Sequence, residues 1–372
     1  MKYKKVKKFK NIVCIFILII IGMLCVFVGR THSASRIDMG INALSNMVEA
    51  DGSIRYKIDF LKNEEYKKNN IVREMGSAYA LAFAYNQTKN KNLEKKLRLI
   101  LSRIQNKYCQ TFEEGTCYVA NDKNKIKIGA TALALLAVLY FEQTNHDSSF
   151  SDLKAQLANA LANSYRENVG IISPTTTKIS PYYDGETWFA LSVYNIFYPS
   201  DKKIEDLLRS LDDTMFKNYK DKYLISFIHW GTMAGSYRFQ ATKDDKFIDF
   251  LKTQFDLYLK NNPIPRKRSS TCSLMEGFSD IVYVISDTDI AFAQKVFNRI
   301  EESNEQIYDL QVIHDEVIGS QSKEFPYIHD KTKKYIGAFK HTPHHYLTRN
   351  DATQHCLIAL LKRERALKKI HP

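Results

Sequence analysis

The chain has 372 residues, enough for one large domain or two smaller ones. Its formal charge is +13, but seven of the Lys and Arg residues lie within the first 30 positions, which leaves about +6 for the rest. A net positive charge this small gives no indication of a nucleic-acid partner. It is compatible with an anionic glycan or an anionic membrane surface as a partner, and equally with an ordinary solvated protein surface.

The chain begins with two segments that are typical of a membrane anchor. Residues 1–10 carry six lysines, and residues 11–29 are uncharged and apolar. At roughly 1.5 Å per residue the second segment is about as long as one bilayer crossing, so we expect a basic cytoplasmic tail followed by a transmembrane anchor or uncleaved signal. The alternative is a signal peptide that is cut near Ser33-Ala34-Ser35. Both interpretations place residues 36–372 outside the cytoplasm, in the periplasm or the extracellular space.

Twelve helices are predicted in the remaining chain, and they alternate between two kinds. The first kind is amphipathic, as in 92–106, where Leu93, Leu97 and Leu101 form one stripe and Lys and Arg fill the other face. The second kind, such as 128–142, is apolar on all sides and is expected to be buried. Outer helices are predicted at 36–49, 92–106, 151–167, 202–216, 243–260 and 288–303. Inner helices are predicted at 70–87, 128–142, 185–197, 226–240, 272–286 and 351–367.

The regular alternation predicts six stacked helical hairpins in one domain, residues 36–372. An open solenoid and a closed ring both fit this spacing. A closed ring is favoured because the buried helices are too apolar to line a wet concave surface. The expected fold is therefore all-α, an (α/α)6 toroid with an inner and an outer ring. Long connections at 50–67, 107–126 and 305–349 are expected to form lids or binding loops.

Four cysteines lie in the predicted domain. Cys109 and Cys117 bracket a short polar loop. The sequence does not decide whether they form a local disulfide or remain two free thiols. Cys272 and Cys356 are expected to be buried thiols. A second disulfide and a zinc site formed with His355 are the alternatives, but we expect no metal and no other cofactor.

Each predicted inner helix begins with a short polar cluster. In an alternating ring these helix N-termini face the same side, where their unpaired N–H groups and partial positive charge suit anionic groups. Three carboxylates in the clusters, Glu276, Asp184 and Asp351, are the candidate catalytic residues. Glycoside hydrolysis needs two carboxyl groups across the sugar, so Glu276 with either Asp184 or Asp351 is the expected acid/base pair.

The other polar and aromatic residues of the clusters are candidates for substrate binding. Aromatic rings pack on the flat C–H faces of sugars, and arginine binds carboxylates or sulfates in a bidentate manner. The competing interpretation is that the polar residues cap their helices or pack in the core. The candidate binding residues are Arg73, Glu74, Tyr183, Glu186, His229, Trp230, Arg349 and His355.

Taken in order, these clusters resemble a known superfamily. The segments that carry the resemblance are Arg73-Glu74-Met75-Gly76, Gly129-Ala130-Thr131, Tyr183-Asp184-Gly185-Glu186, His229-Trp230, Glu276-Gly277 and Asp351-Ala352-Thr353-Gln354-His355. They look like six-hairpin glycosidase-like toroids, most of all bacterial envelope proteins of poorly defined activity. Glucuronyl C5-epimerases, N-acylglucosamine 2-epimerases and unsaturated glucuronyl hydrolases are more distant. The resemblance covers residues 36–372 and implies an (α/α)6 barrel that acts on sugars, without fixing one reaction.

The sequence therefore leads to one main hypothesis and two alternatives. The main hypothesis is an exported, membrane-anchored glycoside hydrolase whose substrate is an envelope or extracellular polysaccharide or oligosaccharide, including an anionic one. The first alternative is a uronic-acid epimerase or polysaccharide lyase, in which Tyr or His abstracts a proton and Arg neutralises the carboxylate. The second is a non-catalytic protein that binds glycans or assists polysaccharide assembly.

Overall fold

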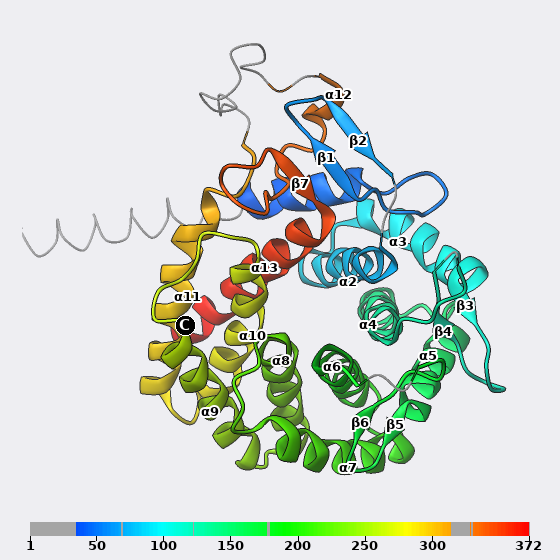
Figure 1. Cartoon of the computed structure of the whole chain (residues 1–372), viewed down its shortest axis with the longest axis vertical. Helices are drawn as coiled ribbons and strands as arrows, with labels where there is room; N and C mark the ends of the chain where they lie inside the picture. Colours follow the sequence, from blue (N-terminus) through cyan, green and yellow to red (C-terminus); the bar gives the residue numbers. More distant parts are fainter. Residues whose placement is uncertain are drawn as a thin grey trace, which may run out of the picture.

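The computed structural model describes residues 35–67, 70–121, 123–176, 179–313, 328 and 330–371. In these ranges the chain forms two concentric rings of helices around one axis (Figure 1). The predicted tail at 1–10 and the predicted anchor at 11–29 lie outside the described residues. Among the helices within those ranges, none is both long enough and apolar enough to cross a bilayer.

Six helices form the inner ring. Each packs against its neighbours in the ring, and α13 packs against both α10 and α2, which closes the ring as predicted. The predicted bounds differ from the observed ones by only a few residues at most ends. The inner helices are α2 (Ile71–Thr88), α4 (Ile128–Asn145), α6 (Pro181–Phe197), α8 (Ile225–Thr242), α10 (Ser270–Ile285) and α13 (Asn350–Ile370).

The outer ring covers the inner one (Figure 1). It begins with a helix at 35–46 and ends with α11 (Ile290–Tyr308), and α3 continues into the π-helical turn η1 (Ile104–Tyr108). A short helix, α12 (Asp330–Lys333), lies in the last long connection. The remaining outer helices are α3 (Lys91–Arg103), α5 (Ser151–Asn163), α7 (Lys202–Tyr219) and α9 (Lys246–Asn261).

Burial explains which helices are inner and which are outer. Every residue of α4 from Ile128 to Glu142 is buried, as expected of a helix surrounded by other helices. In α3 only Leu93, Leu97, Ile100 and Leu101 are buried, so one face packs inward and the Lys and Arg face meets water. Full burial of an apolar side chain of this size stabilises the fold by roughly 1.5–3 kcal/mol. The two kinds of helix are thus sorted by how much apolar surface each must hide.

The all-α prediction holds for the two rings, but it did not include the short strands of the connections, of which the described residues contain seven in three small sheets. The largest has the order β2-β1-β7 and consists of β1 (Lys57–Asp59), β2 (Glu64–Tyr66) and β7 (Leu347–Arg349). Strand β1 lies antiparallel to β7, which leads directly into α13. Two hairpins, β3 (Cys109–Gln110) with β4 (Tyr118–Val119) and β5 (Tyr165–Arg166) with β6 (Gly170–Ile171), complete the set. The strands satisfy backbone groups that the connections would otherwise leave unpaired.

Both cysteine pairs of the domain are disulfide-bonded. Cys109 joins Cys117 across the β3–β4 hairpin, which decides the alternative left open by the sequence. Cys272 joins Cys356, with their Cα atoms 4.7 Å apart, and so links α10 to α13. The expectation of two buried thiols was wrong, because these two inner helices approach closely enough for a bond. The alternative zinc site with His355 is also excluded, since its two thiolates are consumed.

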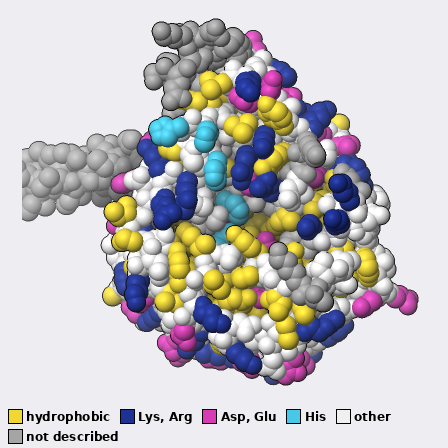
Figure 2. Space-filling view, viewed as in Figure 1, with side chains coloured by type: hydrophobic (Ala, Val, Ile, Leu, Met, Phe, Trp, Pro, Cys, Tyr) yellow, Lys and Arg dark blue, Asp and Glu magenta, His cyan; other side chains and the backbone are white. Residues whose placement is uncertain are grey.

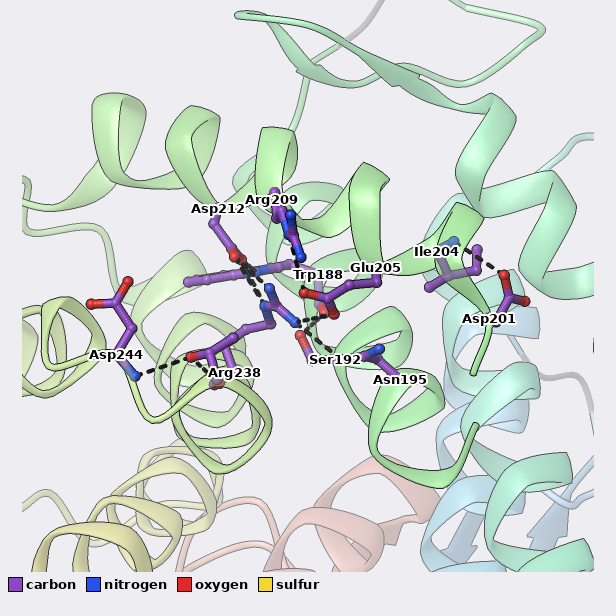
Figure 3. Close-up of polar contacts among 11 residues, drawn as sticks. Trp188, Ser192, Asn195, Asp201, Ile204, Glu205, Arg209, Asp212, Arg238 and Asp244 are labelled. Carbon is purple, nitrogen blue, oxygen red and sulfur yellow. Dashed lines mark hydrogen bonds and ion pairs between the residues drawn. The ribbon is translucent and has the colours of Figure 1, made fainter. Parts of the chain in front are cut away.

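A buried ion pair holds α6, α7 and α8 together toward the C-terminal ends of the inner helices (Figure 3). Arg238 of α8 donates from Nη2 to Oδ2 of Asp212 in α7 at 2.8 Å, and the two side chains are 1% and 2% exposed. Trp188 of α6 donates to the same carboxylate at 2.8 Å. Arg238 also donates to Asn195 and Glu205. The guanidinium of α8 therefore has partners on two other helices, α6 and α7.

This arrangement predicts a large effect of removing the arginine. Arg238→Met leaves the carboxylate of Asp212 buried without its counter-charge, so we expect a loss of about 3–5 kcal/mol in the free energy of unfolding, measured in urea. Arg209→Met is the matched control, because Arg209 contacts Glu205 while 71% exposed, and its loss should cost about 0–1 kcal/mol. Equal unfolding midpoints for the two variants would contradict this account.

Candidate active site

A cavity of about 690 Å³ opens at the N-terminal ends of the inner helices. All six inner helices contribute to it, as the convergence of their N-terminal clusters predicts. In Figure 2 the same face shows a hollow near the ring axis, with histidine and arginine or lysine side chains around it. The inner-helix residues that line the cavity are Val72, Arg73, Gly129, Leu133, Tyr182, Tyr183, Glu186, Ile225, His229, Trp230, Ser270, Ser273, Leu274, Asp351, Gln354 and His355.

The cavity brings together only part of the predicted site. One predicted catalytic carboxylate, Asp351, lines it together with six predicted binding residues: Arg73, Tyr183, Glu186, His229, Trp230 and His355. Four other candidates do not line it: Glu74, Asp184, Glu276 and Arg349. Of these, Arg349 adjoins the cavity through its contact with Asp351, and the other three are buried behind or beside it.

Asp184 points away from the cavity, so the prediction of a catalytic role for it is not supported. Its Oδ1 accepts a hydrogen bond from the backbone N–H of Ile171 at 2.6 Å, and its Oδ2 accepts one from the hydroxyl of Tyr219. Gly170 lies at a φ of +125°, and a Cβ there would meet Asp184 Oδ1 at 2.6 Å. The carboxylate therefore fastens the β5–β6 hairpin to α6. Burial raises its pKa to about 6, against these two hydrogen bonds.

Glu74 also turns outward and does not line the cavity, so its predicted role in substrate binding is not supported. Its Oε1 accepts hydrogen bonds from the backbone of Ile54 and from the hydroxyl of Tyr108, each at 3.2 Å. Burial raises its pKa to about 7, and the hydrogen bonds oppose that shift. Glu74 thus ties α2 to the connections on the outer side.

Glu276 is fully buried beneath two histidines that line the cavity. His355 of α13 lies with Nδ1 2.7 Å from Glu276 Oε1, and His229 of α8 lies with Nε2 3.3 Å from Oε2. Both carboxylate oxygens are occupied and the side chain is 0% exposed, so a sugar cannot reach it. The prediction that Glu276 donates or accepts a proton directly therefore needs correction: it orients the two histidines, which do reach the cavity.

The three residues of this triad differ in charge. Burial would raise the pKa of Glu276, but the positive charge of His355 and the hydrogen bonds of both histidines hold it at about 2. Since an ionised carboxylate only accepts, both histidines must donate. Burial lowers the pKa of His229 to about 4. For His355, burial is outweighed by the charge of Glu276, so its pKa is raised. His355 therefore holds a proton more readily than a free imidazole, whereas His229 beside it is neutral at neutral pH.

The triad is also the group, among the residues that the structure describes, whose atoms best match a metal site. Its candidate ligand atoms all lie within 4.8 Å of one another. The same atoms form the two hydrogen bonds between Glu276 and the histidines. An ion would have to replace both bonds, so the geometry fits a hydrogen-bonded relay better than a preformed metal centre.

Glu186 is a buried carboxyl group inside the cavity, 5% exposed. It comes from the first turns of α6 and packs against Gly129 of α4, where a Cβ would meet its Oε2 at 2.1 Å. Only glycine leaves room for the carboxyl at this close approach. Burial raises the pKa of Glu186 to about 8, with no nearby charge to oppose it. Glu186 is therefore protonated at neutral pH.

Asp351 has the opposite electrostatic setting on the facing side of the ring. Arg349 donates from Nε to its Oδ1 at 2.8 Å and binds its Oδ2 as well, and Nε of Arg73 lies 3.1 Å from Oδ2. Burial acts to raise the pKa of Asp351, but these hydrogen bonds and positive charges lower it overall. Asp351 is therefore ionised while Glu186 keeps its proton.

Aromatic side chains form part of the cavity lining. Trp230 lines it with its ring centroid 4.1 Å from that of His229, and Tyr182 and Tyr183 line the part nearest Glu186. Tyr182 is 51% exposed. Tyr79 and Trp188 are buried in the core and do not line the cavity.

The lining residues that were not predicted include two basic ones, Arg268 and His341. Arg268 ends the basic run Arg266-Lys267-Arg268, immediately before α10, and this position one turn ahead of a predicted cluster was the available signal. His341 lies in the long connection that was expected to form a binding loop. Its Nδ1 lies 2.7 Å from the hydroxyl of Ser269, which holds the loop against the start of α10.

Solved structures share this fold, although no protein-family model matches the chain and no curated protein matches it in sequence. The α-1,6-mannanase GH76A of Salegentibacter sp. HEL1_6 aligns with a TM-score of 0.67 at 10% identity, over 90% of this chain and 99% of that one. The family 76 glycoside hydrolase Bt3792 of Bacteroides thetaiotaomicron VPI-5482 aligns with a TM-score of 0.65 at 11% identity, over 91% and 99%.

A second group of similar structures consists of unsaturated glucuronyl hydrolases. One that is specific for heparin aligns with a TM-score of 0.63 at 14% identity, over 90% of this chain and 98% of that one. A variant of the enzyme from Streptococcus agalactiae gives 0.57 at 12% identity, over 89% and 90%. Identities this low establish the fold alone. The fold is that of the six-hairpin glycosidases, as the sequence resemblance predicts.

The triad makes a prediction about histidine titration. Glu276→Gln replaces the carboxylate by a neutral amide of similar size, so the charge that raises the pKa of His355 is lost. We expect the pKa of His355 to fall below its wild-type value, as followed by NMR of the histidine ring protons. Glu74→Gln, a buried carboxyl group outside the cavity, is the control and should leave this titration unchanged. An unaltered His355 titration in Glu276→Gln would contradict the relay.

Proposed function

We propose that the protein is a glycoside hydrolase that acts on an envelope or extracellular polysaccharide or oligosaccharide. The observation that carries this proposal is a pair of carboxyl groups in one cavity whose pKa values move in opposite directions. Glu186 keeps its proton up to about pH 8, whereas the pKa of Asp351 is lowered from its ordinary value, so Asp351 is ionised at neutral pH. Environments that separate two carboxyl groups in this way are typical of a general acid and its partner base.

In this mechanism the two residues act from opposite members of the inner ring, α6 and α13. Glu186 donates its proton to the oxygen of the leaving sugar. Asp351, held by Arg349 and Arg73, accepts a proton from the attacking water. His355, one turn after Asp351, lines the cavity and donates a hydrogen bond to the bound sugar, and Trp230 packs on the face of the sugar ring. This replaces the pair expected from the sequence, since Glu276 and Asp184 do not reach the cavity.

The similar structures support the reaction class but not the identity of the residues. One mannanase variant described as inactive has two consecutive aspartates replaced. Here consecutive aspartates occur at Asp212-Asp213 and Asp244-Asp245, and none of these residues lines the cavity. We therefore assign the acid and base to Glu186 and Asp351 rather than to an aspartate pair.

We also propose that the domain is exported and anchored by residues 11–29. The two disulfides of the domain support an oxidising compartment, because cytosolic thiols are kept reduced. The basic residues that precede the apolar segment support a cytoplasmic N-terminus. A periplasmic or extracellular domain held at the membrane has direct access to envelope glycans.

Substitution of the two carboxyl groups tests the proposal. Glu186→Gln and Asp351→Asn should each lower kcat by about 10²–10⁴-fold, the usual contribution of a general acid or base. The measurement is release of reducing ends from purified envelope polysaccharides, with absorbance recorded for any new double bond. Asp184→Asn is the matched control, because Asp184 lies two residues from Glu186 and faces away from the cavity; its folded fraction should keep wild-type turnover.

Three results would overturn the assignment. Wild-type turnover by Glu186→Gln would rule out Glu186 as the general acid. Products with a new double bond would identify a lyase. A wild-type protein that binds these glycans and leaves them intact would support the non-catalytic alternative.

The pH dependence gives an independent check. Activity requires protonated Glu186 and ionised Asp351, so kcat/KM should fall as the pH rises through about 8 and hold down to the lowered pKa of Asp351. In Glu186→Gln the residual activity should lose the alkaline limb. Because the pKa of Glu186 is higher in the folded than in the unfolded protein, ionisation of Glu186 at alkaline pH lowers the free energy of unfolding. At pH 9, Glu186→Gln should therefore unfold at a higher urea concentration than the wild type. An alkaline limb that persists in this variant would contradict the assignment.

A further inference from the structure

One cation of the cavity, Arg268, has no partner among the residues that the structure describes. Arg268 lines the cavity, and the structure records no hydrogen bond or ion pair to its guanidinium from any described residue. Its Nε is fully buried and unsatisfied. An unpaired buried donor on a charged group costs free energy, and Arg268 lies where a ligand in the cavity would supply its partner.

The other arginines at the cavity already have a carboxylate partner. Arg73 and Arg349 both contact Asp351, whose single negative charge offsets one of their two positive charges. Glu186 carries its proton at neutral pH, and Glu276 is hydrogen-bonded to His355. The cavity therefore keeps an excess of positive charge, and within the described part of the chain Arg268 is the cavity arginine that contacts no carboxylate.

The surroundings of Arg268 suit an anionic group on a sugar. Ser270 and Ser273, on the first turn of α10, line the same wall and offer hydroxyl donors. His341 lines the cavity close enough to Arg268 and Arg349 for their positive charges to add to the effect of burial in lowering its pKa. Hydroxyl donors beside an unpaired guanidinium match the oxygens of a carboxylate or sulfate.

We propose that Arg268 receives an anionic substituent of the substrate, so that the cavity selects a sugar that carries a carboxylate or a sulfate group. This inference rests on the proposed action on glycans and adds the class of sugar to it. Arg268 is a binding residue and takes no part in proton transfer. The acid/base pair and the anion-binding wall are separate parts of the same cavity.

The test compares charged and neutral sugars that are otherwise alike. D-glucuronate, glucose 6-sulfate and D-glucose are titrated into the full-length protein, with binding followed by ligand-observed NMR, which reports millimolar affinities. We expect at least one of the charged sugars to bind about tenfold or more tightly than glucose, and Arg268→Gln to abolish that preference. Comparing the two charged sugars distinguishes a carboxylate from a sulfate site.

Two variants make the result interpretable. Arg266→Gln removes an exposed arginine two residues away and should keep the preference, so an equal loss in Arg266→Gln and Arg268→Gln would reduce the effect to general surface charge and overturn the proposal. Arg268→Lys keeps the charge without the guanidinium fork and should restore part of the preference. Equal affinity of the wild type for glucose and both charged sugars would also overturn it.

The same measurements separate this proposal from the proposed hydrolysis. Glu186→Gln should keep the preference for charged sugars while it loses turnover. Arg268→Gln should raise KM for a charged substrate far more than it lowers kcat. Loss of the preference in Glu186→Gln would show that the anion does not occupy the wall formed by Arg268.

Discussion

The closure of the inner ring is the constraint on which the rest of this structure depends. Because α13 packs against α2, six helices surround one axis, and each begins at the same end of the ring. Their first turns cannot all bury polar residues in a core that is apolar on every side. The polar clusters therefore meet at one mouth, and the apolar lengths of the helices fill the barrel below it. The cavity is the end of a packed core and not a channel through it.

The sequence predicted the two rings well because the signal is strong and local. A helix such as α4, apolar on all sides, has no stable place except between other helices, whereas α3 carries one apolar stripe. The short strands could not be predicted in the same way. In β1 and β7 each pairing joins residues about 290 positions apart, and three residues show no clear alternation. Their position depends on where closure brings the two long connections.

The sequence predicted that the site lies at the N-terminal ends of the inner helices, but not which individual side chains face the cavity. Successive residues on a helix differ by about 100° in direction, so Asp184 and Glu186, two positions apart, point to different surroundings. One fastens a hairpin and the other lies in the cavity. Glu276 shows a second limit, since a carboxylate beneath two histidines has the same sequence signature as one that faces a sugar. Partners from three helices decide these roles, and no local pattern reports them.

The bond between Cys272 and Cys356 has a consequence for the order of maturation. Cys272 lies one turn before Glu276 on α10, and Cys356 directly follows His355 on α13. A covalent link at this level prevents the two helices from sliding past each other, which would separate the carboxylate from its histidine. A newly made chain with reduced thiols holds this alignment through non-covalent contacts alone. Oxidation is then more than a gain in stability: it locks the axial register that the packing of α10 against α13 has set.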